Sequence, residues 1–187
     1  MKIEKTFIDD ILVIFPDVFQ DDRGYFYESY NESILKSQGF EYRFVQDNIS
    51  FSQRNTLRGL HYQAGEFAQG KLCSVLKGCV IDTAVDIRFN SPTFGRCFQI
   101  ELSDDNHTQL WIPPGFAHGF SVISDEVLFS YKCTNLYNKA SERTIIYNDI
   151  DLNIDWKIKS PIVSDKDKKG KSFSSIEKDF IYEKLKS

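Results

Sequence analysis

The sequence predicts a mainly β protein, a sandwich or barrel of many short strands with short peripheral helices. Two observations carry this prediction. Short β-rich runs recur through the middle of the chain, and turn-forming residues such as Gly78, Asn90-Ser91-Pro92 and Ser124-Asp125 separate them. Strands at this spacing are typical of sandwiches and barrels. The predicted strands are residues 43–51, 56–63, 71–77, 79–88, 97–102, 108–112, 118–123 and 126–134.

The run 79–88 shows the clearest alternation. Ile81, Val85 and Ile87 share one face, which we expect to lie in the core. The other face carries Val80, Asp82, Ala84, Asp86 and Arg88. For Asp86 and Arg88 we expect solvent exposure, whereas the alternation leaves the position of Asp82 open.

Helix signals are few. Asn31 can cap a short helix that ends at Gly39. Ser174 or Ser175 can begin a terminal helix with an apolar side made of Ile176, Phe180, Ile181 and Leu185. Residues 164–171 are dense in lysine and aspartate, a composition typical of a mobile loop.

Length and composition bound the function. A chain of 187 residues with 41% hydrophobic and 27% charged residues predicts one folded domain, residues 1–187. The net charge of −4 argues against a nucleic-acid or membrane-surface partner. The sequence has no basic leader and no apolar stretch of membrane-spanning length. The four cysteines lack C-x-x-C and zinc-ligand spacing, so we expect reduced, mostly buried thiols and a cytoplasmic protein.

Two of the three histidines, His61 and His118, lie beside glycine and aromatic residues on predicted strands. Imidazole titrates near neutral pH, so proton transfer is the chemistry this pattern favours. A metal site is disfavoured, because metal sites on strands often use an H-x-H pair and here Gln63 stands two residues after His61. His107 follows a turn and is expected to be an exposed loop residue.

Other catalytic and nucleotide-binding motifs are missing from the sequence. It contains no G-x-S-x-G elbow, no phosphate loop and no G-x-G-x-x-G fingerprint. Acid and base chemistry on a bound small molecule remains, with Lys71 and Tyr131 on predicted strands as further candidates. Strict alternation would place Arg58 and His61 on opposite faces of one strand. If both line one pocket, we expect a bulge or twist at Gly59.

Read together, these segments resemble the dTDP-4-dehydrorhamnose 3,5-epimerase family. The motifs recur in the family's order from about residue 2 to residue 168, which makes coincidence a poor explanation. They are Asp22 to Glu28, Gln46 to Ser50, Leu57 to Gln63, Gln69 to Leu72, Val85 to Arg88, Ser91 to Gly95, Trp111 to Phe120, Tyr131 to Thr134, and Ser164 to Asp167.

The resemblance implies a cupin-type jelly roll that works as a cofactor-independent homodimer on a dTDP-linked 4-keto-6-deoxyhexose. In the family's pattern His61 is the base, Asp167 orients it, Tyr131 is the acid and Lys71 lies near the keto oxygen of the sugar. This requires residues 164–171 to be at least partly ordered. Further substrate-binding residues implied by the resemblance are Arg23, Phe26, Glu28, Gln46, Asp47, Asn48, Arg58, His118, Tyr137, Glu142 and Lys166. His118 is expected near Asp82.

Some positions depart from the family's usual pattern. Cys73-Ser74 follows Lys71 where valine and another residue are more usual, and Lys168 to Lys171 replaces a proline-containing ending. Three alternatives to a 3,5-epimerase remain open on the sequence alone. They are an epimerase that inverts only C3, a barrel that binds sugar nucleotides without activity, and a metal-dependent cupin.

Overall fold

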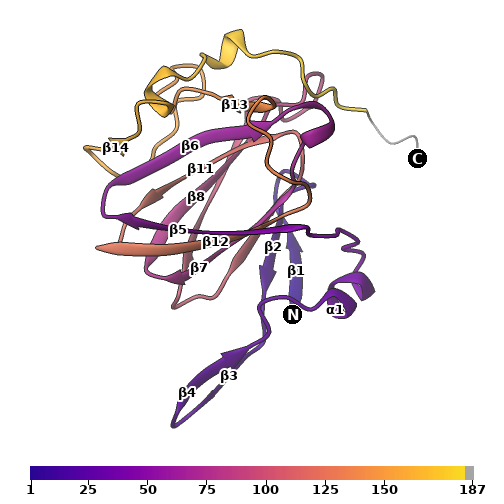
Figure 1. Cartoon of the computed structure of the whole chain (residues 1–187). Helices are drawn as coiled ribbons and strands as arrows, with labels where there is room; N and C mark the ends of the chain where they lie inside the picture. Colours follow the sequence, from indigo (N-terminus) through magenta and orange to yellow (C-terminus); the bar gives the residue numbers. More distant parts are fainter. Residues whose placement is uncertain (184–187) are drawn as a thin grey trace.

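Two antiparallel sheets face each other in the computed structural model, which describes residues 1–183 (Figure 1). The first sheet has the order β1 (Lys2–Lys5), β2 (Leu12–Phe15), β10 (Gln109–Ile112), β7 (Lys71–Lys77), β12 (Glu126–Cys133) and β5 (Gln46–Gln53). The second has the order β13 (Glu142–Thr144), β6 (Thr56–Gln63), β11 (Phe116–Val122), β8 (Cys79–Asp86) and β9 (Cys97–Ser103). β14 (Ile162–Val163) pairs in parallel with β6.

Each of the eight predicted strand runs overlaps one strand, from β5 to β12. The mainly β prediction is therefore confirmed. The sequence interpretation missed the short strands at both ends of the chain, β1 to β4 and β13 to β14. No helix within residues 1–183 is both long enough and apolar enough to cross a membrane.

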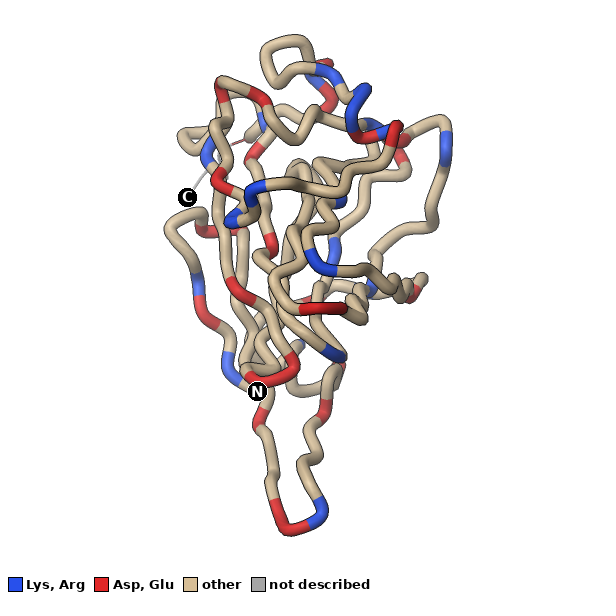
Figure 2. The backbone as a smooth tube through the Cα atoms, turned by 90° about the vertical axis from the view of Figure 1, so that its left-hand side faces the viewer, with Lys and Arg blue, Asp and Glu red and all other residues tan. Residues whose placement is uncertain are grey.

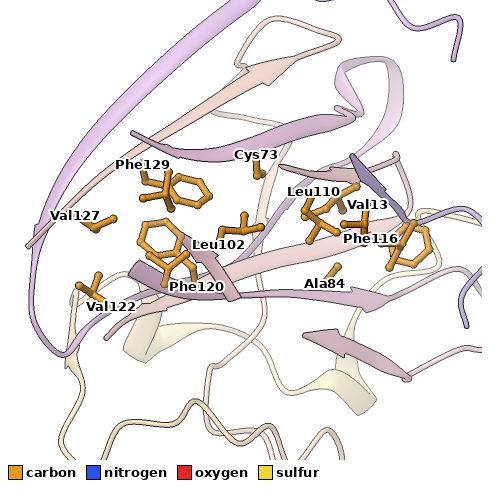
Figure 3. Close-up of a cluster of buried hydrophobic side chains, with 14 of the residues drawn as sticks. Val13, Cys73, Ala84, Leu102, Leu110, Phe116, Phe120, Val122, Val127 and Phe129 are labelled. Carbon is orange, nitrogen blue, oxygen red and sulfur yellow. The ribbon is translucent and has the colours of Figure 1, made fainter. Parts of the chain in front are cut away.

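The main core fills the space between the two sheets (Figure 3). Strand alternation sends every second side chain inward, so Cys73 and Val75 of β7 meet Phe120 of β11 and Phe129 of β12. Phe120 and Phe129 stack with their ring centroids 4.3 Å apart. This end of the barrel is tightly filled with aromatic and aliphatic groups.

The predicted solvent exposure of Asp86 and Arg88 was wrong. Val80, Ala84 and the fully buried Asp82 and Asp86 point into the barrel or its rim, whereas Val85 of the opposite face packs in a second core outside the sheet. Both faces of β8 are covered, so alternation could not separate core from solvent. Asp86 and Arg88 are paired instead of solvated, with Arg88 Nη2 2.7 Å from Asp86 Oδ2.

The segment after β2 forms a hairpin of β3 (Val18–Asp21) and β4 (Gly24–Tyr27). It extends away from the barrel in Figure 1, and Figure 2 shows acidic and basic residues side by side at its tip. There Arg23 Nη2 donates to Asp21 Oδ2 over 2.5 Å. His107 was expected to be exposed but is only partly so. The rings of Tyr25 and Tyr27 lie against it, at centroid distances of 4.5 and 4.8 Å.

Helix α1 (Glu32–Ser37) confirms the first helix prediction, because Asn31 Oδ1 accepts from the Ile34 N–H at 3.1 Å. The predicted terminal helix is wrong. Only a 3₁₀ turn, Phe173–Ser175, forms, and the chain then runs as an extended strap to residue 183, while Leu185 lies outside the described residues. Phe173, Ile176 and Phe180 pack on the outer core of the second sheet, a contact that an extended chain makes as well as a helix.

Candidate active site

His61 of β6 and Asp167 form a hydrogen-bonded pair. The distance between His61 Nε2 and Asp167 Oδ1 is 2.6 Å, and Asp167 is 2% exposed. Asp167 begins a 3₁₀ turn, Asp167–Lys169, and its Oδ2 accepts from the Gly59 N–H at 3.3 Å. Burial acts to raise the pKa of Asp167, but the hydrogen bonds from His61 and Gly59 outweigh burial and lower that pKa. The carboxylate is therefore ionised and holds the imidazole in place.

The irregularity expected at Gly59 is present. The pairing of β6 with β11 shifts between His61, opposite His118, and Arg58, opposite Phe120. Gly59 has a φ of +131°, and a Cβ there would lie 2.5 Å from the Gly119 Cα. The shift lets Arg58 and His61 line one cavity of about 540 Å³, together with Lys166 and Asp167.

His61 also lies in the wall of a second cavity, of about 270 Å³. Its wall brings together Lys71 of β7 and Tyr131 of β12, which come from the sheet opposite β6. Lys71 Nζ lies 3.5 Å from the His61 carbonyl oxygen. The four predicted catalytic residues thus lie on the walls of two cavities that meet at His61.

Burial shifts the pKa of two of these side chains, Tyr131 and Lys71. It raises the pKa of Tyr131 to about 12, so the phenol keeps its proton at neutral pH. It lowers the pKa of Lys71, although the neighbouring Cys73, Cys133 and Asp82 act to raise it. A proton donor and a poorly solvated cation therefore share one small cavity.

His118, which pairs with His61 in the sheet, is 6% exposed, and its Nε2 lies 2.5 Å from Asp82 Oδ1. Burial lowers the pKa of His118, and Asp82 opposes that shift. The expected proximity of His118 to Asp82 is confirmed. His118 lines neither of the two cavities at His61.

The structure brings many of the predicted substrate-binding residues to these cavities. Gln46, Asn48, Tyr137 and Glu142 line the smaller one. Lys166, which lines the larger, donates to Glu142 over 2.7 Å and so bridges the two. Sequence reasoning did not single out Gln63 and Gln69, which also line the smaller cavity. The two-residue spacing from His61 could have pointed to Gln63.

Four predicted residues do not meet His61 within this chain. Arg23 and Phe26 lie on the projecting hairpin and line a hollow on it, and Glu28 follows the hairpin and accepts from Asn31. Asp47 points to the outer face of β5, where it pairs with Lys132. Within the described chain, these four residues are exposed at the surface and do not line the cavities at His61.

Comparisons with known proteins agree on one family. The family model described as dTDP-4-dehydrorhamnose 3,5-epimerase matches residues 5–175. A protein of that name from Shigella flexneri is 50% identical over 174 residues, which are 92% of this chain and 96% of that protein. The crystal structure of a dTDP-6-deoxy-D-glucose-3,5-epimerase from Legionella pneumophila, in complex with dTDP-4-keto-L-rhamnose, superposes with a TM-score of 0.94 at 46% identity, covering 98% of this chain and 99% of that one. A 3′-monoepimerase from Streptomyces bikiniensis, bound to dTDP-quinovose, superposes with a TM-score of 0.86 at 28% identity, over 91% of this chain and 87% of that one.

Proposed function

The chain belongs to the dTDP-4-dehydrorhamnose 3,5-epimerase family, and we propose that it inverts C3 and C5 of dTDP-4-keto-6-deoxy-D-glucose to give dTDP-4-keto-L-rhamnose. It is an isomerase with the cupin-type jelly roll of its structural relatives. The observation that carries the proposal is the His61–Asp167 pair at a cavity that also holds Lys71 and Tyr131.

The reaction needs a base, an acid and a positive charge. The C4 ketone acidifies the protons on C3 and C5, and loss of either proton gives an enolate. In the neutral imidazole, Nε2–H donates to Asp167, which leaves Nδ1 of His61 free to accept a proton from carbon. The ionised carboxylate then stabilises the imidazolium that forms.

Tyr131 returns a proton to the enolate from the opposite face of the ring. Its raised pKa keeps the phenol protonated until that step. Lys71 offers an ammonium group to the oxygen that carries the enolate charge, and such a group is more effective in a poorly solvated cavity than in water. The cycle returns every proton and electron pair, so its balance requires no added cofactor.

Charged side chains around the larger cavity suit the diphosphate of the substrate. Arg58 and Lys166 line it, and a guanidinium fork matches phosphate oxygens. Tyr137, 53% exposed at the smaller cavity, offers a ring on which the thymine can stack. Gln46, Asn48 and Glu142 provide polar groups for the sugar.

The hairpin supports the homodimer that we propose. Phe19 and Phe26 on it are 64% and 66% exposed, and Ile49 and Phe51 on the outer face of β5 are 66% and 53% exposed. Large apolar groups exposed along an arm and an edge strand are typical of an interface. If a second copy of the chain covers these groups, Arg23 and Phe26 of one protomer can reach the active site of the other.

The alternatives have less support. This chain is 28% identical to the 3′-monoepimerase of Streptomyces bikiniensis but 50% identical to the 3,5-epimerase of Shigella flexneri. The higher identity favours inversion at both carbons over a C3-only epimerase. A barrel that only binds the nucleotide would not need the complete set of His61, Lys71, Tyr131 and Asp167. For the cellular location we propose the cytoplasm, because all four cysteines are free thiols.

Incubation with dTDP-4-keto-6-deoxyglucose tests the function. Proton NMR of the product should show the L-rhamno configuration, with both C3 and C5 inverted. A product inverted at C3 alone would move the protein to the C3-only class. Binding of dTDP without turnover would favour a receptor, and turnover that a chelator abolishes and metal restores would favour a metal-dependent cupin.

A further inference from the structure

A buried trio of potential metal ligands lies between the sheets, below the cavity that Lys71 lines. Cys73 of β7, Asp82 of β8 and His118 of β11 each offer one ligand atom, and these atoms lie within 4.8 Å of one another. Figure 3 shows Cys73 inside the barrel, near Phe129. The three residues come from three strands of two sheets, so the fold fixes their arrangement.

The spacing of sulfur and nitrogen suits a shared cation. Cys73 Sγ lies 3.8 Å from His118 Nε2. Two such ligands on one tetrahedral zinc ion, with bonds of about 2.3 and 2.0 Å, lie roughly 3.5 Å apart. Little movement of β7 against β11 is therefore needed for both atoms to reach one ion.

The third residue has an unused oxygen. Asp82 is 0% exposed, and its Oδ2 has no hydrogen-bond partner among the described residues. A buried oxygen without a partner carries a desolvation cost that a cation would remove. His118 Nε2 and Asp82 Oδ1 are 2.5 Å apart, so a metal ion must displace the proton that they share before Nε2 can coordinate it, and the unpartnered Oδ2 is the carboxylate oxygen free to join.

We propose that Cys73, Asp82 and His118 form a binding site for one thiophilic divalent cation such as Zn²⁺. A thiolate and a carboxylate supply two negative charges, which balance the ion in a place where net charge is costly. Sulfur, imidazole and carboxylate are the ligand types that zinc prefers, and three of them leave a fourth position open.

The test is a titration of the full chain with Co²⁺, which reports thiolate coordination by a charge-transfer band in the near ultraviolet. We expect one equivalent to bind with this band and Zn²⁺ to displace it. Cys73→Val removes the sulfur and keeps an apolar side chain, and should bind Co²⁺ at least about tenfold more weakly. Cys97→Ala removes a half-buried thiol of β9 outside the trio and should bind like the parent.

A parent chain without the thiolate band, or a Cys73→Val variant that keeps it, would overturn the site. Asp82→Asn, with nearly the same shape, should also weaken binding, and thermal melting checks that each variant is folded.

Discussion

Asp167 reaches His61 across 106 residues of sequence and accepts its Nε2–H over 2.6 Å. Asp167 lies four residues after β14, which pairs with β6, so the same part of the chain positions the carboxylate and extends the sheet. The pair therefore depends on the ordered packing of the C-terminal third against β6.

Asp167→Asn tests the role of the carboxylate. The amide keeps the shape but removes the charge that stabilises the imidazolium and can present the wrong hydrogen-bonding group to Nε2. We expect turnover to fall by about 10²–10⁴-fold. Binding of dTDP, measured by calorimetry, should change little, because Asp167 is 2% exposed and its carboxylate oxygens are already occupied by His61 and the Gly59 N–H. A variant with turnover near that of the parent would remove Asp167 from the mechanism.

Tyr131→Phe separates proton removal from proton return. His61 should still take a proton from carbon, exchange it with solvent and give it back to the same face. In heavy water, NMR should therefore show deuterium entering recovered substrate, while formation of inverted product falls by about 10²–10⁴-fold. Normal rates of inversion would mean that another group is the acid.

The lowered pKa of Lys71 predicts that turnover declines on the alkaline side of its pH profile, here called the alkaline limb. The ammonium is the active form, and burial lowers its pKa below the usual 10.5, so activity should decline as pH rises through that lowered value. Tyr131, with a pKa of about 12, loses its proton later. In Lys71→Arg the group stays charged, so turnover should be lower but this limb should move to higher pH. A limb at the parent's position in the variant would assign it elsewhere.

The hairpin predicts complementation between two defective chains. When His61→Ala and Arg23→Ala chains are mixed and reassembled, each mixed dimer would contain one site with both residues intact. Because about half of the dimers are mixed, roughly a quarter of parental turnover should return. Each variant alone supplies the control. No recovery in mixtures whose dimers are verified by native mass spectrometry would contradict contribution of Arg23 across the interface.

Much of the barrel could be predicted because its central strands carry strong local signals. Alternation and turn residues located β5 to β12, and Asn31 marked the start of α1. The edges could not be predicted equally well. β13 and β14 are only three and two residues long, and their pairing with β6 depends on tertiary contacts. The prediction of a terminal helix failed because Ile176 and Phe180 can also pack on the second sheet from an extended strap.

The site was predictable where the family motifs include the residue, and its geometry was not. The residues alone made His61, Lys71 and Tyr131 candidates, but only the resemblance gave Lys71 and Tyr131 their roles and supplied Asp167. Alternation assigned Asp86 and Arg88 to solvent because it does not register that a strand is covered on both faces. The projection of Arg23 and Phe26 away from His61 depends on the path of the hairpin, which no local pattern encodes.

The exchange of solvent deuterium into C3 and C5 by the His61→Ala variant tests the central claim most directly. We expect both exchange rates to fall together by about 10²–10⁴-fold while dTDP still binds, because one base would serve both carbons. Exchange at C5 that continues at the parental rate in His61→Ala would contradict the claim and require a second base.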